Sequence, residues 1–396
     1  MKKHFKYLLC LVLLFCFIIS FSACGGNKDA EDTTAESTEA EVTDNENKES
    51  TEASTEAETE PIVEVDDNKP EFVNPLTGMP SETDLSTKRP VSIMVNNIEA
   101  SLPQSGIYNA DILFECLAEG GITRLMMIST EYEDLPKVGS VRSARDYYID
   151  WAESFNCIFI HAGGSDQAYS TLASRGTNRL DGVNGPCPGN LFYRDQERRN
   201  NGYASEHTLF ITDGTEIAKA ISSMGYSTTK AAGYETPMVF REWGADTVKG
   251  TANATHVGVD VSSYQHVDYV YDEKSEQYLR YQYDGQPHMD YTANKQLAFK
   301  NVLILYNESG IISGDEKNRL WMTTTGESTG YYITAGTYRE IIWKKSSHDS
   351  VIKYFYKDDG TEVQFNRGKT MINIVNNSYK SKTVFDDNTE QFESKE

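Results

Sequence analysis

The sequence predicts an α+β protein, with a layered sheet-and-helix N-terminal domain over 71–243 and a β-rich C-terminal domain over 244–376. A disordered acidic linker precedes both. In the first domain, strand patterns alternate with amphipathic helix patterns. In the second, short strands follow one another between polar turns, with few helix signals. Aromatic and β-branched residues become frequent only from about Glu71 onward, which places the start of the folded part there.

The N-terminus has the features of an export signal. A basic segment, Met1–Lys6, precedes an uncharged apolar run, Tyr7–Ile19. This run is shorter than the roughly 20 residues of a membrane span but fits a signal-peptide core. The residues leading into Cys24 resemble a lipobox. We therefore expect cleavage after residue 23, lipidation of Cys24 and anchoring at the outer face of the plasma membrane; a non-lipidated signal and an uncleaved anchor are the alternatives.

Residues 24–70 predict a disordered tether. Asp29 to Asp67 contains 16 Asp or Glu against the single Lys48, so this segment cannot bury enough apolar surface to fold. Loss of the three lysines in residues 1–23 takes the net charge of the chain from −23 to −26. Such a charge argues against nucleic acid as a partner, because nucleic-acid binding relies on a basic surface.

The expected elements follow from hydrophobic periodicity. In the first domain we expect strands at 91–96, 111–118, 122–130 and 157–161, and helices at 144–154, 166–174 and 215–223. In the second we expect strands at 256–261, 267–271, 277–283, 301–306, 319–324, 351–356 and 371–375. Residues 377–396 are expected to form a frayed polar tail.

One hairpin can be predicted in detail. Strands 111–118 and 122–130 flank Glu119-Gly120-Gly121, and Gly-Gly is a strong signal for a two-residue turn. This turn would set Leu117 opposite Arg124 and leave Arg124 diagonally between Glu115 and Glu119. Arg124 and one of these glutamates would form either a cross-strand salt bridge or the charged floor of a binding cleft. A longer turn would shift this register.

Two arginines precede the helix expected at 144–154. Ser143 and Asp146 fit a capping box, but capping does not explain Arg142 and Arg145, because cations are disfavoured at a helix start. The two guanidinium groups would suit a phosphate or carboxylate ligand. Internal ion pairs with nearby Asp or Glu side chains are the equal alternative.

A second segment, Cys157–Gln167, predicts a buried strand, a glycine turn and a helix capped by Ser165. His161 would end the strand, and the backbone N–H groups of Gly163, Gly164 and Ser165 would offer an anion site at the helix start. The alternative is a tight turn that uses glycine for its geometry and Ser165 for capping.

Other chemistry is less marked. Glu206 and His207 could supply acid–base groups if a turn brings them to the same side. The histidines show no metal-ligand spacing and no Cys-x-x-Cys is present, so we expect no zinc site and no cofactor, and a calcium site built from scattered carboxylates is the alternative left open for metals.

Several motifs together resemble the YerB-like lipoproteins of Gram-positive bacteria, a family of unknown function. In the first domain they are Arg89–Asn97, Pro103–Gly106, Ala118–Arg124, Val141–Asp146 and His161–Ser165. In the second they are 278–290, Asn301–Leu303, Trp343-Lys344 and Arg367–Thr370. The resemblance covers about 74–375 and implies the same two-part α+β architecture. It implies no established activity, so no catalytic role is transferred.

The leading hypothesis is a membrane-anchored protein that binds an anionic envelope ligand, such as a phosphorylated or carboxylated glycan. The residues expected to take part are Glu119, Arg124, Arg142, Arg145, His161, Gly163, Gly164, Ser165 and His207. A hydrolase or phosphotransferase acting on envelope glycans is the second hypothesis. A scaffold that recruits proteins through its β-rich domain is the third.

Overall fold

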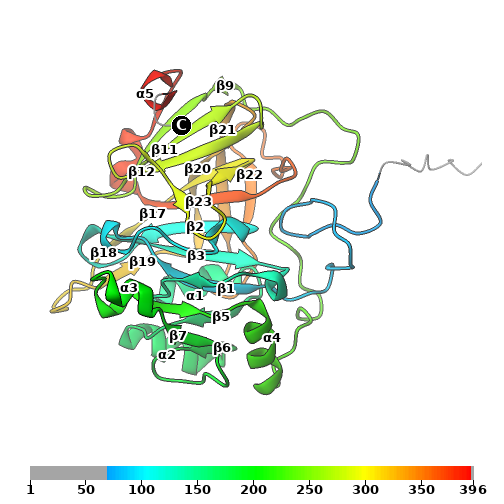
Figure 1. Cartoon of the computed structure of the whole chain (residues 1–396). Coiled ribbons are helices and arrows are strands. Elements are labelled where there is room, and N and C mark those ends of the chain that lie inside the picture. The colour runs from blue at the N-terminus through cyan, green and yellow to red at the C-terminus, as the bar shows by residue number, and fades with distance from the viewer. Residues whose placement is uncertain (1–68, 394–396) are drawn as a thin grey trace, which may run out of the picture. The chain divides into compact units, whose positions relative to one another are not determined.

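The computed structural model describes residues 69–393, and the fold is α+β as the sequence predicts. The expected signal peptide, the lipidation site Cys24 and nearly all of the acidic tether lie outside the described residues. A single large sheet runs through the body, in the order β22-β21-β20-β17-β23-β2-β3-β1-β5-β6, with β9 paired to β21. Figure 1 shows β2 and β3 near the middle of the body.

The central strands come from both ends of the described chain. Their bounds are β1 (Val91–Asn96), β2 (Ile112–Leu117), β3 (Thr123–Ser129), β5 (Ile158–His161), β6 (Arg179–Asp181) and β23 (Thr370–Asn376). β2 lies antiparallel to β3 and parallel to β23, and β1 lies parallel to β5, which is parallel to β6. The remaining strands of the sheet are β9 (Ala252–Asn253), β17 (Asn301–Asn307), β20 (Gly326–Thr334), β21 (Thr337–Lys345) and β22 (Lys353–Tyr356).

The pairing of β2 with β23 joins the two expected domains. Ile112–Cys116 pair with Thr370–Ile374, although more than half of the chain separates them. The described residues, 69–393, accordingly lie in one compact unit.

A second sheet, β13-β12-β11-β10-β24, with β16 paired to β12, packs on one face of the large sheet. Its strands are β10 (His256–Asp260), β11 (His266–Asp272), β12 (Gln277–Gln282), β13 (Gln286–Pro287), β16 (Ala298–Phe299) and β24 (Val384–Asp386). Val257, Val259 and Val267 share a core with Val91, Ile93 and Val95 of β1. Smaller pairings are β14 (Met289–Asp290) with β15 (Lys295–Gln296), β18 (Ser309–Ile311) with β19 (Leu320–Met322), and β4 (Val138–Gly139) with β8 (Leu209–Ile211) and β7 (Phe192–Arg194).

The helices cover the large sheet on both faces because alternate side chains of its strands point to opposite sides. Helix α4 (Gly214–Ser223) packs through Ile217 and Ile221 on the face that the second sheet also covers. Helices α1 (Asp146–Glu153) and α2 (Asp166–Arg175) pack on the other face, where Trp151 and Leu172 join Phe159 of β5. Helix α3 (Gln196–Asn200) and helix α5 (Glu390–Glu393) are short.

Most expected elements of the first domain are confirmed, but two local predictions are wrong. The turn between β2 and β3 holds three residues, Glu119–Gly121, so the register differs by one residue and Arg124 faces Cys116. Helix α1 begins at Asp146 with Arg145 as its N-cap, and no side chain caps it, so Ser143 and Asp146 form no capping box.

The C-terminal segment is docked, against the expectation of a frayed tail. After a 3-10 turn at Asn377–Lys382, β24 pairs with β10. Phe392 is 3% exposed and its ring lies 4.7 Å from the ring of Tyr281.

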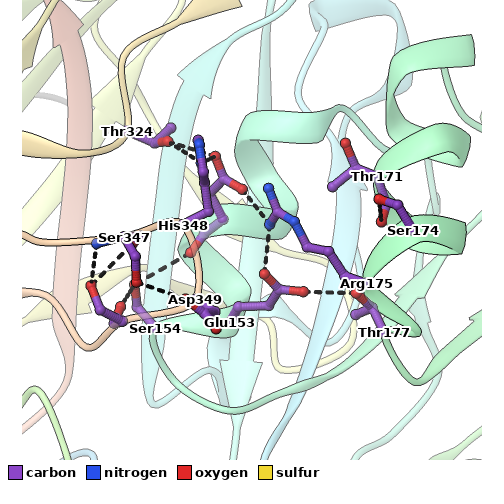
Figure 2. Close-up of polar contacts among 12 residues, drawn as sticks. Glu153, Ser154, Thr171, Ser174, Arg175, Thr177, Thr324, Ser347, His348 and Asp349 are labelled. Atoms are coloured by element: carbon purple, nitrogen blue, oxygen red, sulfur yellow. Dashed lines mark hydrogen bonds and ion pairs between the residues drawn. The ribbon is translucent and has the colours of Figure 1, made fainter.

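A polar network fastens the loop after β21 to α1. Asp150 on α1 bonds to Arg175 at 2.6 Å, to Thr324 at 2.5 Å and to Nδ1 of His348 at 2.9 Å. Arg175 also bonds to Glu153 at 2.6 Å. In Figure 2, the labelled side chains of Thr324, His348, Glu153 and Arg175 converge from these segments. This network is a second attachment between residues of the two expected domains.

Candidate functional site

The carboxyl ends of β1, β5 and β6 lie at one edge of the large sheet, where they place Asn96, His161 and Asp181. The segment before α1 crosses this edge. The Arg142 N–H donates to Met94 O at 2.9 Å, and the Ala162 N–H donates to Arg142 O at 3.0 Å. In open α/β sheets this edge is the usual place for a ligand.

Two of the predicted arginines bind the same carboxylate. Arg145 donates to both oxygens of Glu119, with Nη2 2.7 Å from Oε2, and Arg124 Nη2 lies 3.4 Å from the same Oε2. Burial alone would raise the pKa of Glu119, but the hydrogen bond from Arg145 and the charge of Arg124 outweigh it and lower this pKa. Arg124 and Arg145 therefore form internal ion pairs, the alternative that the sequence left open.

The predicted approach of Arg124 to Glu115 is wrong. The one-residue shift in register places Glu115 opposite Leu125, on the other face of the sheet from Arg124. Burial, and then repulsion from Arg145, lower the pKa of Arg124 to about 10.

Arg142 differs from its two neighbours. Among the described residues it has no ion-pair partner; Nη1 lies 3.4 Å from the backbone oxygen of exposed Glu206, and Nε is buried without a hydrogen-bond partner. Burial lowers the pKa of Arg142, an effect that the charge of Glu206 opposes and that of Arg145 reinforces. Arg142 is half-buried. Two guanidinium groups, those of Arg124 and Arg145, thus contact the Glu119 carboxylate, and the third, that of Arg142, contacts no carboxylate among the described residues.

His207 lies beside Arg142. The side-chain amide nitrogen of Asn96 lies 2.9 Å from Nδ1 of His207, so an amide in this orientation makes Nδ1 an acceptor. Burial and the charge of Arg142 lower the pKa of His207. Arg198 donates to the backbone oxygens of Ser101 at 2.8 Å and of His207 at 3.5 Å.

The glycine turn is held by internal contacts. Asp181, which the sequence did not single out, accepts the Gly163 N–H at 2.9 Å and the Tyr169 hydroxyl at 2.8 Å. Nδ1 of the fully buried His161 bonds to Gly163 O at 2.7 Å. Gly163 has a φ of +78°, which favours glycine. The turn's geometry is thus explained without a ligand.

The predicted cap of α2 is confirmed, because the Ala168 N–H donates to Ser165 Oγ at 3.1 Å. Asp166, in the first turn of α2, forms an ion pair with Arg319 at 2.8 Å. The Asp166 carboxylate therefore already interacts favourably with the positive end of the α2 dipole. Gly164 forms a bridge with Ala144, so the glycine turn and the arginine segment lie side by side.

A buried network that sequence reasoning missed lies beneath this edge. Arg280 donates to Glu115 at 2.6 Å and contacts Nδ1 of His288. Nε2 of His288 bonds to the side-chain oxygen of Gln104 at 2.9 Å, and Asn97 donates to Glu115 at 2.9 Å. Burial and the charge of Arg280 hold the pKa of His288 well below its usual value. All but Glu115 stand in the motifs that carry the family resemblance, the signal that could have found them.

A hollow opens beside Arg198. It has about 370 Å³ of empty space, part of it open to solvent, and is lined by Pro103, Lys137, Asp195, Glu197, Arg198, Asn201, Tyr203 and Tyr291. A larger polar groove in the C-terminal half is lined by carboxylates that include Asp246 and Glu273. Within residues 69–393, no group of His, Cys, Asp and Glu side chains is arranged to hold a metal ion.

Over the same range, no helix is both long and apolar enough to cross a membrane. A family model described as "Protein of unknown function (DUF3048) N-terminal domain" matches residues 76–227, and the model of its C-terminal domain matches 257–372. The chain is 32% identical to the "Putative lipoprotein YerB" of Bacillus subtilis over 324 residues, which cover 78% of this chain and 88% of that protein. The crystal structure of YerB from the same organism matches with a TM-score of 0.64 at 31% identity, covering 77% of this chain and 96% of that one.

Proposed function

The chain belongs to the DUF3048 family of proteins of unknown function, and on that premise we propose that it is a lipid-anchored protein of the cell envelope that binds an anionic ligand beside Arg142. The name of the Bacillus subtilis relative, a putative lipoprotein, supports the anchor. The lipobox-like residues before Cys24 support it independently. In this proposal the acidic tether carries the folded body away from the membrane surface.

The observation that carries the binding proposal is the excess of guanidinium groups at the edge of the sheet. Arg124, Arg142 and Arg145 lie close together there, and among the described residues Arg124 and Arg145 share the Glu119 carboxylate while Arg142 contacts no side-chain carboxylate. Arg124 and Arg142 have buried Nε groups without a hydrogen-bond partner. A phosphate or carboxylate that approaches Arg142 would relieve the mutual repulsion and accept two parallel hydrogen bonds.

A phosphorylated or carboxylated envelope glycan remains the ligand class that fits this charge and this location. The catalytic alternative has less support, because its candidate groups are occupied or enclosed. Glu119 is held by two arginines, and His161 is fully buried. The scaffold alternative has no particular contact in its favour.

Equilibrium binding of a glycerol phosphate polymer to the full-length chain in detergent micelles tests the proposal. We expect Arg142→Ala to weaken binding about tenfold or more, because a hydrogen bond to a charged group contributes roughly 1.5–3 kcal/mol. Arg339→Ala is the matched control. It removes the same charge from a residue of β21 that forms ion pairs with Asp358 and Asp359. Equal affinities in the wild type and Arg142→Ala would refute the proposal.

A further inference from the structure

The end of the chain is held on the second sheet at two points by His256 of β10. The first point is Asp386 of β24, whose Oδ1 lies 2.7 Å from Nδ1 of His256. The second is Phe392 of α5, whose ring centre lies 5.4 Å from that of His256. Figure 1 shows α5 beside β11 and β12, and the Phe392 ring also contacts Tyr281 of β12. One histidine thus contacts both ends of residues 386–392.

The surroundings of His256 favour its doubly protonated form. Its Nε2 lies 2.9 Å from Oδ1 of Asp268 on β11, so each ring nitrogen faces a carboxylate. A carboxylate only accepts hydrogen bonds, and a histidine donates from both ring nitrogens only when it carries both protons. Burial alone would lower the pKa of His256, but the hydrogen bonds to Asp268 and Asp386 outweigh it and raise this pKa above 6.5. A charged imidazole is also attracted by the aromatic ring of Phe392.

The remaining charged groups of this cluster lie outside residues 386–392 and are His266, Asp260, Asp268 and Lys382. His266 donates to the same Oδ1 of Asp268 at 3.1 Å, and Lys382 lies 3.9 Å from Asp260. Burial would raise the pKa of Asp268, but the hydrogen bonds from His256 and His266 lower it to about 2. Asp268 therefore stays charged while the histidines titrate, and His266 acts on His256 only through this carboxylate.

Few other contacts hold residues 386–392 on the second sheet. The Thr255 hydroxyl donates to Asp387 at 2.8 Å, and β24 ends at Asp386, whose side chain is 42% exposed. The residue before it is held more firmly, because the Phe385 ring stacks on Tyr338 with ring centres 3.8 Å apart. A segment with so few buried contacts can open locally while the rest of the body stays folded. Phe385 marks the boundary of the part that stays in place.

We propose that residues 386–392 form a pH-dependent latch, which docks on the second sheet while His256 carries both protons and detaches when His256 loses one of them. Docking brings the Asp386 carboxylate to a histidine that otherwise has only Asp268 beside it. The docked state therefore binds the second proton of His256 more tightly than the detached state does. By linkage, protonation of His256 strengthens docking.

The direction of the pH dependence follows from the raised pKa. Below pH 6.5 His256 is protonated and docking is at full strength. As pH rises above 6.5 and through the raised pKa, docking weakens, because the detached state gives up the proton first. Release of a single proton lowers the docking equilibrium constant by up to about tenfold per pH unit in this range.

Detachment would uncover an apolar patch that the Phe392 ring covers. Val270 and Tyr281 are 9% and 1% exposed in the docked state, and partly buried Leu279 packs beside them. The latch thus controls access to this face of the second sheet. The proposal is independent of the anionic ligand at Arg142, because no group of the latch belongs to that site.

Hydrogen–deuterium exchange of the full-length chain in detergent micelles tests the latch. The exchange rate of each backbone N–H is divided by that of an unstructured peptide at the same pH, from about pH 5 to about pH 10. The resulting protection of residues 386–392 should be constant at the acidic end and fall by up to about tenfold per pH unit above pH 6.5. Protection of β2 reports on the whole body and should not fall with it.

Two asparagine variants identify the group that senses the charge of His256. In Asp386→Asn the latch brings no charge to His256, so most of the pH dependence of protection should disappear. Asp387→Asn is the matched control, since it removes the same charge from the next residue, whose partner is the neutral Thr255. It should lower protection to a similar extent at every pH and keep the wild-type pH dependence. His266→Gln should keep it too, because His256 retains both of its carboxylates.

Three results would overturn the proposal. The first is protection of residues 386–392 that does not change with pH in the wild type. The second is an equal fall with pH in the wild type and Asp386→Asn, because another group would then control the segment. The third is a matching fall in the protection of β2, because the whole body and not the latch would then be opening.

Discussion

The ion pair between Glu115 and Arg280 should make a large contribution to holding the two halves of the body together. Both side chains are fully buried, and Glu115 Oε2 lies 2.6 Å from Arg280 Nη2. Glu115 stands on β2, and Arg280 stands on β12 of the second sheet. Replacing one partner with methionine, which roughly keeps the chain length, leaves the other charge buried without its counterion.

Removing one partner of a buried pair costs about 3–5 kcal/mol. The two single variants should differ within this range. In Glu115→Met the guanidinium of Arg280 remains fully buried, and only neutral partners such as Gln282, at 2.9 Å, are left to it. In Arg280→Met the Glu115 carboxylate keeps its bonds from Asn97 at 2.9 Å and Thr123 at 2.6 Å. Glu115→Met should therefore lower the free energy of unfolding more.

The double variant Glu115→Met/Arg280→Met should be more stable than the sum of the two single losses predicts, because no unpaired charge remains. Urea unfolding followed by fluorescence and by circular dichroism measures these differences in the free energy of unfolding. The unfolding transitions seen by the two probes must coincide.

An exposed pair provides the control for this prediction. Lys344 and Glu327 face each other across β20 and β21, 3.0 Å apart, with side chains 51% and 63% exposed. Lys344→Met should lower the free energy of unfolding by no more than about 1 kcal/mol. If Glu115→Met lowers the free energy of unfolding as little as Lys344→Met does, the argument that a buried charge is costly without its counterion is refuted.

Two further predictions concern the second sheet. The hydrogen bond that His266 donates to Asp268, opposed by burial and aided by Asp260, raises the pKa of His266 to about 9. Because this folded-state pKa exceeds the unfolded value near 6.5, the stabilisation from His266 is complete below about pH 6.5 and disappears as pH rises through 9. Urea midpoints of wild type and His266→Gln should therefore converge between pH 6.5 and 9; parallel pH profiles would contradict this. Phe392→Ala should lower the free energy of unfolding by about 3 kcal/mol and expose the C-terminal segment to protease. Val384→Ala is the control and should do neither, because this side chain is already 44% exposed. Unchanged proteolysis of Phe392→Ala would show that the Phe392 ring does not hold the segment.

Local patterns in the sequence were enough to locate most strands and helices of the first domain. The strand expected at 91–96 is β1 with the same bounds, and the helix expected at 166–174 is α2 with one residue more. Both predictions depend on neighbours in the chain: a continuous apolar run in one case, a serine cap and helical periodicity in the other. Interactions of this kind are visible without knowledge of the tertiary fold.

Strand register and the pairing of distant strands could not be predicted from such local patterns. Gly120-Gly121 predicts a two-residue turn, but Glu119 joins the turn, and this one-residue change moves Glu115 away from Arg124 and toward Arg280. The pairing of β2 with β23 joins segments more than 250 residues apart. Hydrophobic periodicity shows that a strand is buried but does not show which distant strand lies beside it.

The candidate site was predicted in part for the same reason. The sequence located Arg142 and Arg145 but left their partners open, because ion pairs depend on the packing of α1 against the β2–β3 turn. In the structure Arg145 is bound by Glu119 while Arg142 is not bound by any carboxylate of the described residues. The hollow could not be predicted, since its lining comes from segments as distant as Pro103 and Tyr291.

The motifs that carry the family resemblance include several buried polar side chains, and Arg142 differs from these. Gln104, Arg280 and His288 are at most 2% exposed, and each bonds to another side chain inside the protein. Their presence in the motifs is explained by the fold, because an unpaired polar group in such a position would be costly. Arg142 stands in a motif too, yet it is half-buried and no internal ion pair explains it. A motif arginine without an ion-pair partner among the described residues is the strongest reason to search for the ligand at this edge of the sheet.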